Sequence, residues 1–199
     1  METITIEKTL FTFDELSQDA KETACQEVLW DEWSADIVST CTSVLETLGF
    51  YNSTKKGLYV YFTGFSSQGD GACFEGNVSY EKGCLKKIKE EYPQWTELHS
   101  VVERYVAVQK RAFYGIKGRI TQSGMYYHEH SMDFLLEDQH GNYLNDELEK
   151  EFTEVCRDLA RLFYKSIEED YEYQLSEECA KDTAEANDYK FTEDGKLYW

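Results

Sequence analysis

Apolar positions recur along this chain with the periods of helices and strands, and each period occurs several times. Residues 2–11 alternate polar and β-branched side chains, which predicts a half-buried strand. A helix is expected to follow and to run to about Trp30. Thr12 and Glu15 have the spacing of a capping box, and Ser17 offers a second N-cap, so a short turn should lead into the longer helix.

The next segment predicts a helix and then two strands. A helix over about residues 33–48 would end at Gly49, which can adopt the left-handed conformation of a helix terminus. Residues 58–63 and 72–80 are rich in β-branched and aromatic side chains. Because they flank the glycine-rich segment Gly64–Gly71, we expect them to pair as antiparallel strands.

The middle of the chain repeats this order. A short basic helix over residues 83–92 and a longer one over 95–110 are expected from apolar side chains at helical spacing. Strands are expected over 113–122 and 126–136, with a hairpin turn at 121–125.

The last third predicts the longest helix and a terminal hairpin. The turn at residues 140–142 precedes a helix whose buried stripe alternates steps of three and four residues: Leu148, Phe152, Val155, Leu159 and Leu162. Asp194 and Gly195 lie between two aromatic segments, which is a strong hairpin signal.

Together these elements predict the fold class α+β. Strands that arrive in adjacent pairs favour an antiparallel sheet, here of about four to six strands, with helices packed mainly on one face. A length of 199 residues with Pro93 as the single proline and no Gly/Ser-rich linker predicts one domain over residues 1–199.

Composition excludes several classes of protein. No run of apolar residues is long enough to span a bilayer, and the N-terminus lacks the features of a signal peptide. The six cysteines form no C-x-x-C pair, so we expect free thiols in a reducing cytosol and no zinc-finger-like site. The expected location is the cytoplasm, without membrane contact.

The net charge of −19, from 39 acidic and 20 basic residues, has consequences for partners. The negative electrostatic field of such a protein repels phosphate backbones, so direct nucleic-acid binding is not expected. The expected partner is a basic protein. The alternative is that the acidity serves solubility. Residues 137–188 hold 17 acidic and 5 basic side chains, whereas residues 82–119 form a basic strip that could pair with them.

The candidates for contact with a basic partner are the carboxylates of the long helix. They are Glu147, Glu151, Glu154, Asp158, Glu168, Glu169 and Asp170.

The glycine-rich segment is the first candidate ligand site. Its three glycines permit a close backbone approach, and consecutive amides could bind an anion. Ser66, Ser67, Gln68 and Asp70 add hydrogen-bonding side chains. The segment lacks the lysine of a phosphate-binding P-loop, and the alternative interpretation is an ordinary hairpin turn.

A second candidate is the pair of histidines in Tyr126–Asp133. On a strand, His128 and His130 share one face and Glu129 lies on the other. The pair could supply two metal ligands, or one histidine could act as a general base. The alternative is two half-exposed histidines that pack beside tyrosines.

No complete catalytic motif is present. The chain has no G-x-S-x-G nucleophile elbow, and Cys73 could at most meet a histidine in space. The sequence therefore assigns no catalytic residue, no metal and no cofactor.

Four segments together resemble a known family. They are FDELSQDAKE (13–22), GFSSQGDGACFE (64–75), YHEHSM (127–132) and ANDYKFTEDGK (186–196). In these the chain is similar to a family of uncharacterised bacteriophage proteins, some of which carry loose antitoxin-like labels. The resemblance spans most of the chain, implies phage origin and expression in the bacterial host's cytoplasm, and assigns no activity.

Three hypotheses about function follow. The first is a phage-encoded accessory protein that binds and inhibits a basic host or phage protein, such as a defence or nucleic-acid-handling factor, by nucleic-acid mimicry. The second is a ligand-binding protein or enzyme whose site lies where the Gly64–Gly71 loop meets His128 and His130. The third is an antitoxin.

Overall fold

The computed structural model describes residues 7–30, 32–52 and 58–198. Its contacts divide the chain into two compact units. Unit 1 comprises Met1–Ala35 with Glu169–Trp199, and unit 2 comprises Asp36–Glu168. The division falls within the long helix α5 (Asp146–Gln174). That residues 1–199 form one domain stays a prediction.

Unit 2 contains an antiparallel sheet built around one central strand. That strand, β3, pairs with β1 and β2 along one edge and with β4 along the other, and β5 pairs with β4. The bounds are Phe50–Tyr51 for β1, Tyr59–Phe62 for β2, Ala72–Ser79 for β3, Lys117–Gln122 for β4 and Met132–Glu137 for β5.

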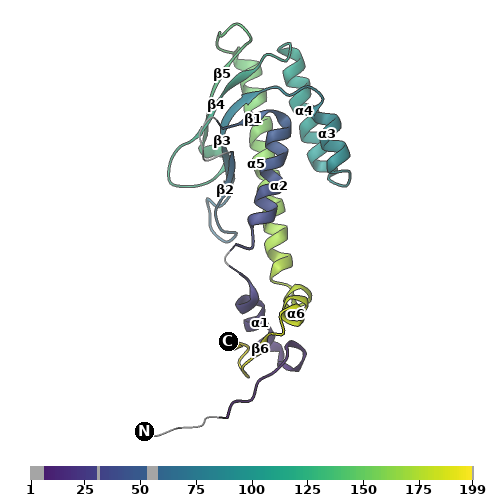
Figure 1. The fold of residues 1–199 in the computed structure, drawn as a ribbon. Helices are drawn as coiled ribbons and strands as arrows, with labels where there is room; N and C mark the ends of the chain where they lie inside the picture. The colour runs from purple at the N-terminus through teal and green to yellow at the C-terminus, as the bar shows by residue number, and fades with distance from the viewer. Residues whose placement is uncertain (1–6, 31, 53–57, 199) are drawn as a thin grey trace, which may run out of the picture. The chain divides into compact units, whose positions relative to one another are not determined.

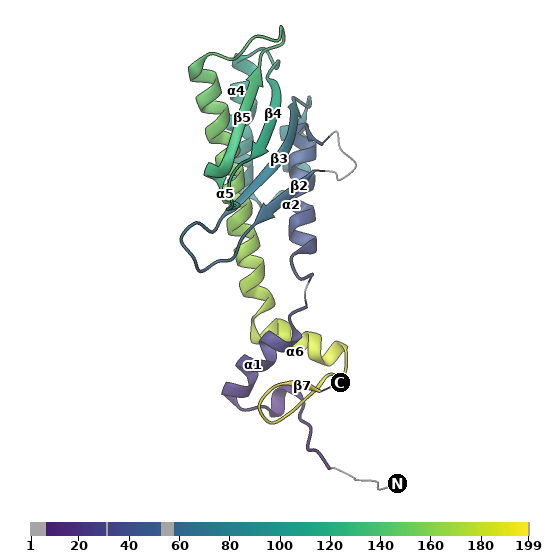
Figure 2. The same cartoon turned by 90° about the vertical axis from the view of Figure 1, so that its left-hand side faces the viewer.

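The helices of unit 2 cover one face of this sheet. They are α2 (Ala35–Leu48), α3 (Cys84–Glu91), α4 (Thr96–Arg111) and the first part of α5. In Figure 1 they lie on one side of the strands, and Figure 2 shows the sheet in front of α2, α4 and α5. The predicted α+β class, with helices on one face of an antiparallel sheet, is confirmed.

The core of unit 2 lies between the sheet and the helices. Phe74 of β3 is fully buried, and its ring lies 5.4 Å from that of Phe50 in an edge-to-face contact. Tyr105 of α4 is also fully buried, and its hydroxyl donates to the carbonyl of Leu48 at 2.9 Å. This bond satisfies both a buried hydroxyl and one of the last carbonyl groups of α2.

Unit 1 has a smaller core of its own. It consists of a 3-10 turn (Phe13–Glu15), α1 (Gln18–Val28), α6 (Glu177–Ala186) and the hairpin strands β6 (Lys190–Phe191) and β7 (Leu197–Tyr198). The buried residues are Phe13, Leu16, Ala20, Ala24, Cys25, Ala180, Ala184 and Phe191.

Most of the predicted elements of unit 1 are confirmed. Glu15 accepts from the backbone amide of Thr12 at 2.8 Å, Ser17 caps α1, and the terminal hairpin forms. Helix α6 was not predicted, because its buried positions are alanines, which give no strong apolar stripe. Of the strand predicted over 2–11, residues 2–6 lie outside the described residues. Residues 7–10 are irregular, and Phe11 alone bridges to Phe191.

Two predicted strands begin later than expected. The strand predicted from Phe113 starts at Lys117, because Phe113 and Tyr114 both have positive φ angles, 53° and 60°. The strand predicted from Tyr126 starts at Met132, and the residues before it form turns.

Gly49 and Gly83 provide a matched test of the packing of α2 against β3. Both have positive φ angles. A Cβ at Gly49 would lie 2.0 Å from the carbonyl oxygen of Ser79, whereas a Cβ at Gly83 would have no neighbouring heavy atom within 4 Å. We expect Gly83→Ala to lower the free energy of unfolding by about 1 kcal/mol, from backbone strain alone. We expect Gly49→Ala to lower it by about 3 kcal/mol or more, because a clash is added. Urea unfolding of both variants measures the difference, and equal losses would contradict the close approach.

Candidate functional site

The Gly64–Gly71 loop joins β2 to β3 and is held by hydrogen bonds of its own. Oδ2 of Asp70 accepts from the backbone amides of Ser66 at 2.9 Å and of Ser67 at 2.6 Å. These bonds, first that from Ser67, lower the pKa of the Asp70 carboxyl group. Two amides that could have bound an anion are thus already used, while Ser66, Ser67 and Gln68 themselves are exposed.

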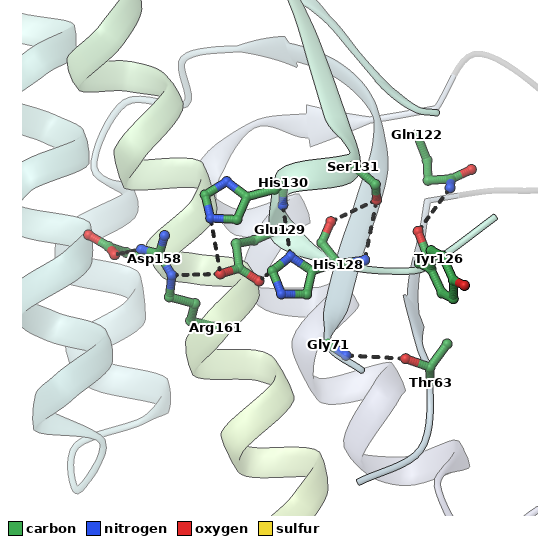
Figure 3. Close-up of polar contacts among 10 residues, drawn as sticks. All are labelled: Thr63, Gly71, Gln122, Tyr126, His128, Glu129, His130, Ser131, Asp158 and Arg161. Carbon is green, nitrogen blue, oxygen red and sulfur yellow. Dashed lines mark hydrogen bonds and ion pairs between the residues drawn. The ribbon is translucent and has the colours of Figure 1, made fainter. Parts of the chain in front are cut away.

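The loop meets the histidine segment at its last glycine. A Cβ at Gly71 would lie 2.9 Å from Cδ2 of His128, so the backbone of Gly71 lies directly against that ring. The amide of Gly71 donates to Oγ1 of Thr63 at 3.1 Å, as Figure 3 shows. The structure therefore brings the loop and His128 together through Gly71.

His128 and His130 do not lie on a strand, so that prediction is wrong. Residues Glu129–Ser131 form a 3-10 turn in which the amide of Ser131 donates to the carbonyl of His128 at 2.9 Å. The hydroxyl of Ser131 donates to the same carbonyl at 2.7 Å. The local hydrogen bonds of Ser131 compete with a strand ladder, which explains why β5 begins only at Met132.

This turn gathers three potential ligand side chains. Oε2 of Glu129 lies 3.0 Å from Nδ1 of His128, and Oε1 lies 3.8 Å from Nε2 of His130 (Figure 3). The imidazole rings stack with centroids 5.3 Å apart. Sequence reasoning placed Glu129 on the opposite face and so missed it. The sequence signal that could have revealed this turn, and with it the position of Glu129, is Ser131. It lies three residues after His128, the spacing at which two residues cap the start of a helical turn.

A chain of charged contacts ties this cluster to α5. Nε of Arg161 donates to Oε1 of Glu129 at 2.9 Å, and Nη1 donates to Asp158 at 2.5 Å. Asp158 also pairs with Arg104 of α4. Figure 3 shows Arg161 between the carboxylates of Glu129 and Asp158. The side chain of Glu129 is 12% exposed, so its carboxylate is fixed at the edge of the cluster.

Cys73 lies close to the same turn but is not an activated nucleophile. The thiol is fully buried, and burial raises its pKa to about 11 despite a hydrogen bond with the side chain of Ser131. Nucleophilic cysteines have lowered pKa values in partly exposed, electropositive surroundings. The thiol is therefore a buried packing group.

The acidic residues proposed on α5 largely pair with arginines of unit 2. Arg111 contacts Glu147 at 2.8 Å and Glu151 at 2.5 Å, and Arg157 contacts Glu154 at 2.7 Å. Asp158 pairs with Arg104 and Arg161. Internal pairing reduces the field that these four carboxylates present to a partner.

Three further candidates on α5 lie at the division between the units. Glu168 is the last residue of unit 2, and Glu169 and Asp170 are the first residues of the second segment of unit 1. These three stay predictions as contacts for a partner.

Most of the charge belongs to unit 1. Its 66 residues carry 19 acidic and 5 basic side chains, a balance of −14, whereas the 133 residues of unit 2 carry 20 and 15, a balance of −5. Four of the five lysines of unit 1 are already paired with carboxylates: Lys21, Lys181, Lys190 and Lys196. The sequence alone did not reveal this concentration of negative charge, because unit 1 is formed from two segments at opposite ends of the chain.

The thiols give a test of the burial around this site. Cys179 is half-buried and the other five cysteines are buried. With a pKa of about 11, roughly one in a thousand Cys73 thiols is ionised at pH 8. We expect one thiol to react quickly with Ellman's reagent in the folded protein, and six in urea. Cys179→Ser should remove the fast phase and Cys73→Ser should leave it. A fast phase that Cys73→Ser removed would contradict this burial.

Comparison with known proteins gives one match. The family model described as a domain of unknown function, DUF8835, matches residues 33–177, which include all of unit 2. No curated protein matches, and no solved structure matches. Among the described residues, no helix is long and apolar enough to cross a membrane. The match covers more than half of the chain, and the chain therefore belongs to the DUF8835 family, a family of unknown function.

Proposed function

We propose that this chain is a non-catalytic binding protein that holds a basic partner protein through unit 1. The observation that carries the proposal is the balance of −14 on this unit, most of whose lysines are engaged internally. Complementary charge raises the rate of association and suppresses binding to acidic partners. The geometry thus favours unit 1 over the paired face of α5 as the docking surface.

Exposed carboxylates on two helices of unit 1 are the contacts we propose. Asp19 and Glu22 lie one turn apart on α1, and Glu178 and Asp182 lie one turn apart on α6. All four side chains belong to exposed residues, and none forms an ion pair within the described part of the chain. Pairs of carboxylates at this spacing repel each other in the free helix, so a cationic partner would relieve that repulsion.

The partner we propose is a basic protein of a bacterial host or of a phage. A defence factor or a nucleic-acid-handling factor fits, because its groove for phosphates would accept a dense array of carboxylates. The resemblance to bacteriophage proteins supports this setting. An antitoxin that neutralises a basic toxin is one form of the same activity.

A charge-neutralised variant tests the proposal. It carries Asp19→Asn, Glu22→Gln, Glu178→Gln and Asp182→Asn. The probe is a labelled oligo-arginine peptide at low and at raised ionic strength. We expect the dissociation constant at low salt to rise by at least about threefold, and the difference to shrink as salt is added.

The matched control removes the same number of charges from unit 2. It carries Glu46→Gln, Glu91→Gln, Asp133→Asn and Glu137→Gln, all at exposed positions. Equal loss of binding in the two variants would mean that total charge and not unit 1 attracts the cation, and the proposal would fail. Capture from bacterial lysate with both variants then identifies the natural partner, which the unit 1 variant should recover less well.

A further inference from the structure

The cluster formed by His128, Glu129 and His130 has chemistry that binding of a basic protein does not use. Within the described residues it is the group of histidine, cysteine and carboxylate side chains whose ligand atoms come together, all within 4.8 Å of one another. The other two histidines are engaged elsewhere: Nε2 of His99 lies 2.9 Å from the carbonyl oxygen of Tyr92, and His140 lies 3.0 Å from Gln139.

The separations between the ligand atoms suit a small metal ion. Two ligands bound to Zn²⁺ at its usual bond lengths in a tetrahedral site lie about 3.3 to 3.6 Å apart. Each oxygen of Glu129 faces one imidazole: Oε2 lies 3.0 Å from Nδ1 of His128, and Oε1 lies 3.8 Å from Nε2 of His130, so both separations are close to that range.

The three side chains combine one fixed ligand with two adjustable ones. Arg161 holds Oε1 of Glu129, which leaves Oε2 facing His128. The side chain of His130 is 59% exposed and that of His128 30%, so both rings are accessible to an ion from solvent. A rotation of the His130 side chain suffices to bring its nitrogen closer, because an exposed ring changes rotamer at little cost.

Two contacts oppose an ion, and both are weak or compensated. Nδ1 of His128 accepts a hydrogen bond from the amide of His130 at 3.2 Å, and a bound ion would break this bond. Because the bond is exposed, water can accept from the amide in its place. The guanidinium of Arg161 repels a cation, but it lies in a network in which Arg161 and Arg104 face the carboxylates of Glu129 and Asp158, so its charge is partly offset. Partners of this kind, one shell behind the ligands, orient metal-bound carboxylates in proteins.

We propose that His128, Glu129 and His130 form a binding site for a divalent transition-metal ion of the Zn²⁺ class. Imidazole nitrogens with one carboxylate select Zn²⁺, Co²⁺, Ni²⁺ or Cu²⁺ over Mg²⁺ and Ca²⁺, which prefer sets of oxygen ligands. Three protein ligands leave a position for water or for a group from a partner. All three residues belong to unit 2, so the site is independent of the acidic surface of unit 1.

Calorimetric titration of the untagged full chain with ZnCl₂, in the presence of excess Mg²⁺, tests this site. The Mg²⁺ occupies non-specific sites among the carboxylates. We expect one equivalent of Zn²⁺ to bind, and we expect His130→Ala and Glu129→Gln each to weaken binding by at least about tenfold. Co²⁺ should give the visible absorption of a site with nitrogen ligands, and both variants should lose it.

His140→Ala is the matched control, because it removes an exposed histidine outside the cluster. Circular dichroism confirms that each variant is folded. The proposal is overturned if the wild type binds no Zn²⁺ in excess Mg²⁺, or if both cluster variants bind it as tightly as the wild type. It is also overturned if His140→Ala loses as much affinity as they do.

Discussion

The packing of the central strand on the long helix is the constraint on which the rest of unit 2 depends. Phe74 of β3 lies between Phe50 and Phe163 of α5, with ring centroids at 5.4 Å and 6.5 Å. Because side chains alternate along a strand, fixing Phe74 inward turns Cys73 and Glu75 to the other face. A shift of one residue would place Glu75 among the apolar side chains under the helices and move Phe74 to the opposite face, so the register of the sheet has no close alternative.

The fold could be predicted largely where the signals were local. Capping residues such as Ser17, the left-handed Gly49 and the pair Asp194–Gly195 each act through backbone geometry within a few residues, and each lies where expected. The turn around Ser131 was missed because its side chain competes with a strand that has ample β-propensity. Helix α6 was missed because alanines pack tightly without giving a strong apolar pattern.

The candidate site shows where sequence reasoning reached its limit. The histidines were identified by their spacing, but the expected strand would have sent Glu129 to the other face. The three side chains meet because a 3-10 turn wraps them around one point, and Arg161, 32 positions away in sequence, fixes the carboxylate. Contacts at such separation depend on the packing of α5 and cannot be inferred from local pattern.

The distribution of charge separates the two proposed binding properties. Unit 2 supplies arginines for the carboxylates of its own α5, as Arg111 does for Glu147 and Glu151, so its balance is close to neutral for its size. The first 32 residues and the last 22 lie outside the DUF8835 match and belong to unit 1, whose lysines are too few to neutralise its carboxylates. A metal ion held by His128 and His130 would be bound through directional bonds from neutral imidazoles. A basic protein would instead be attracted by the net negative charge of unit 1. Raised salt therefore weakens the second interaction much more than the first, which makes the two separable in one preparation of the protein.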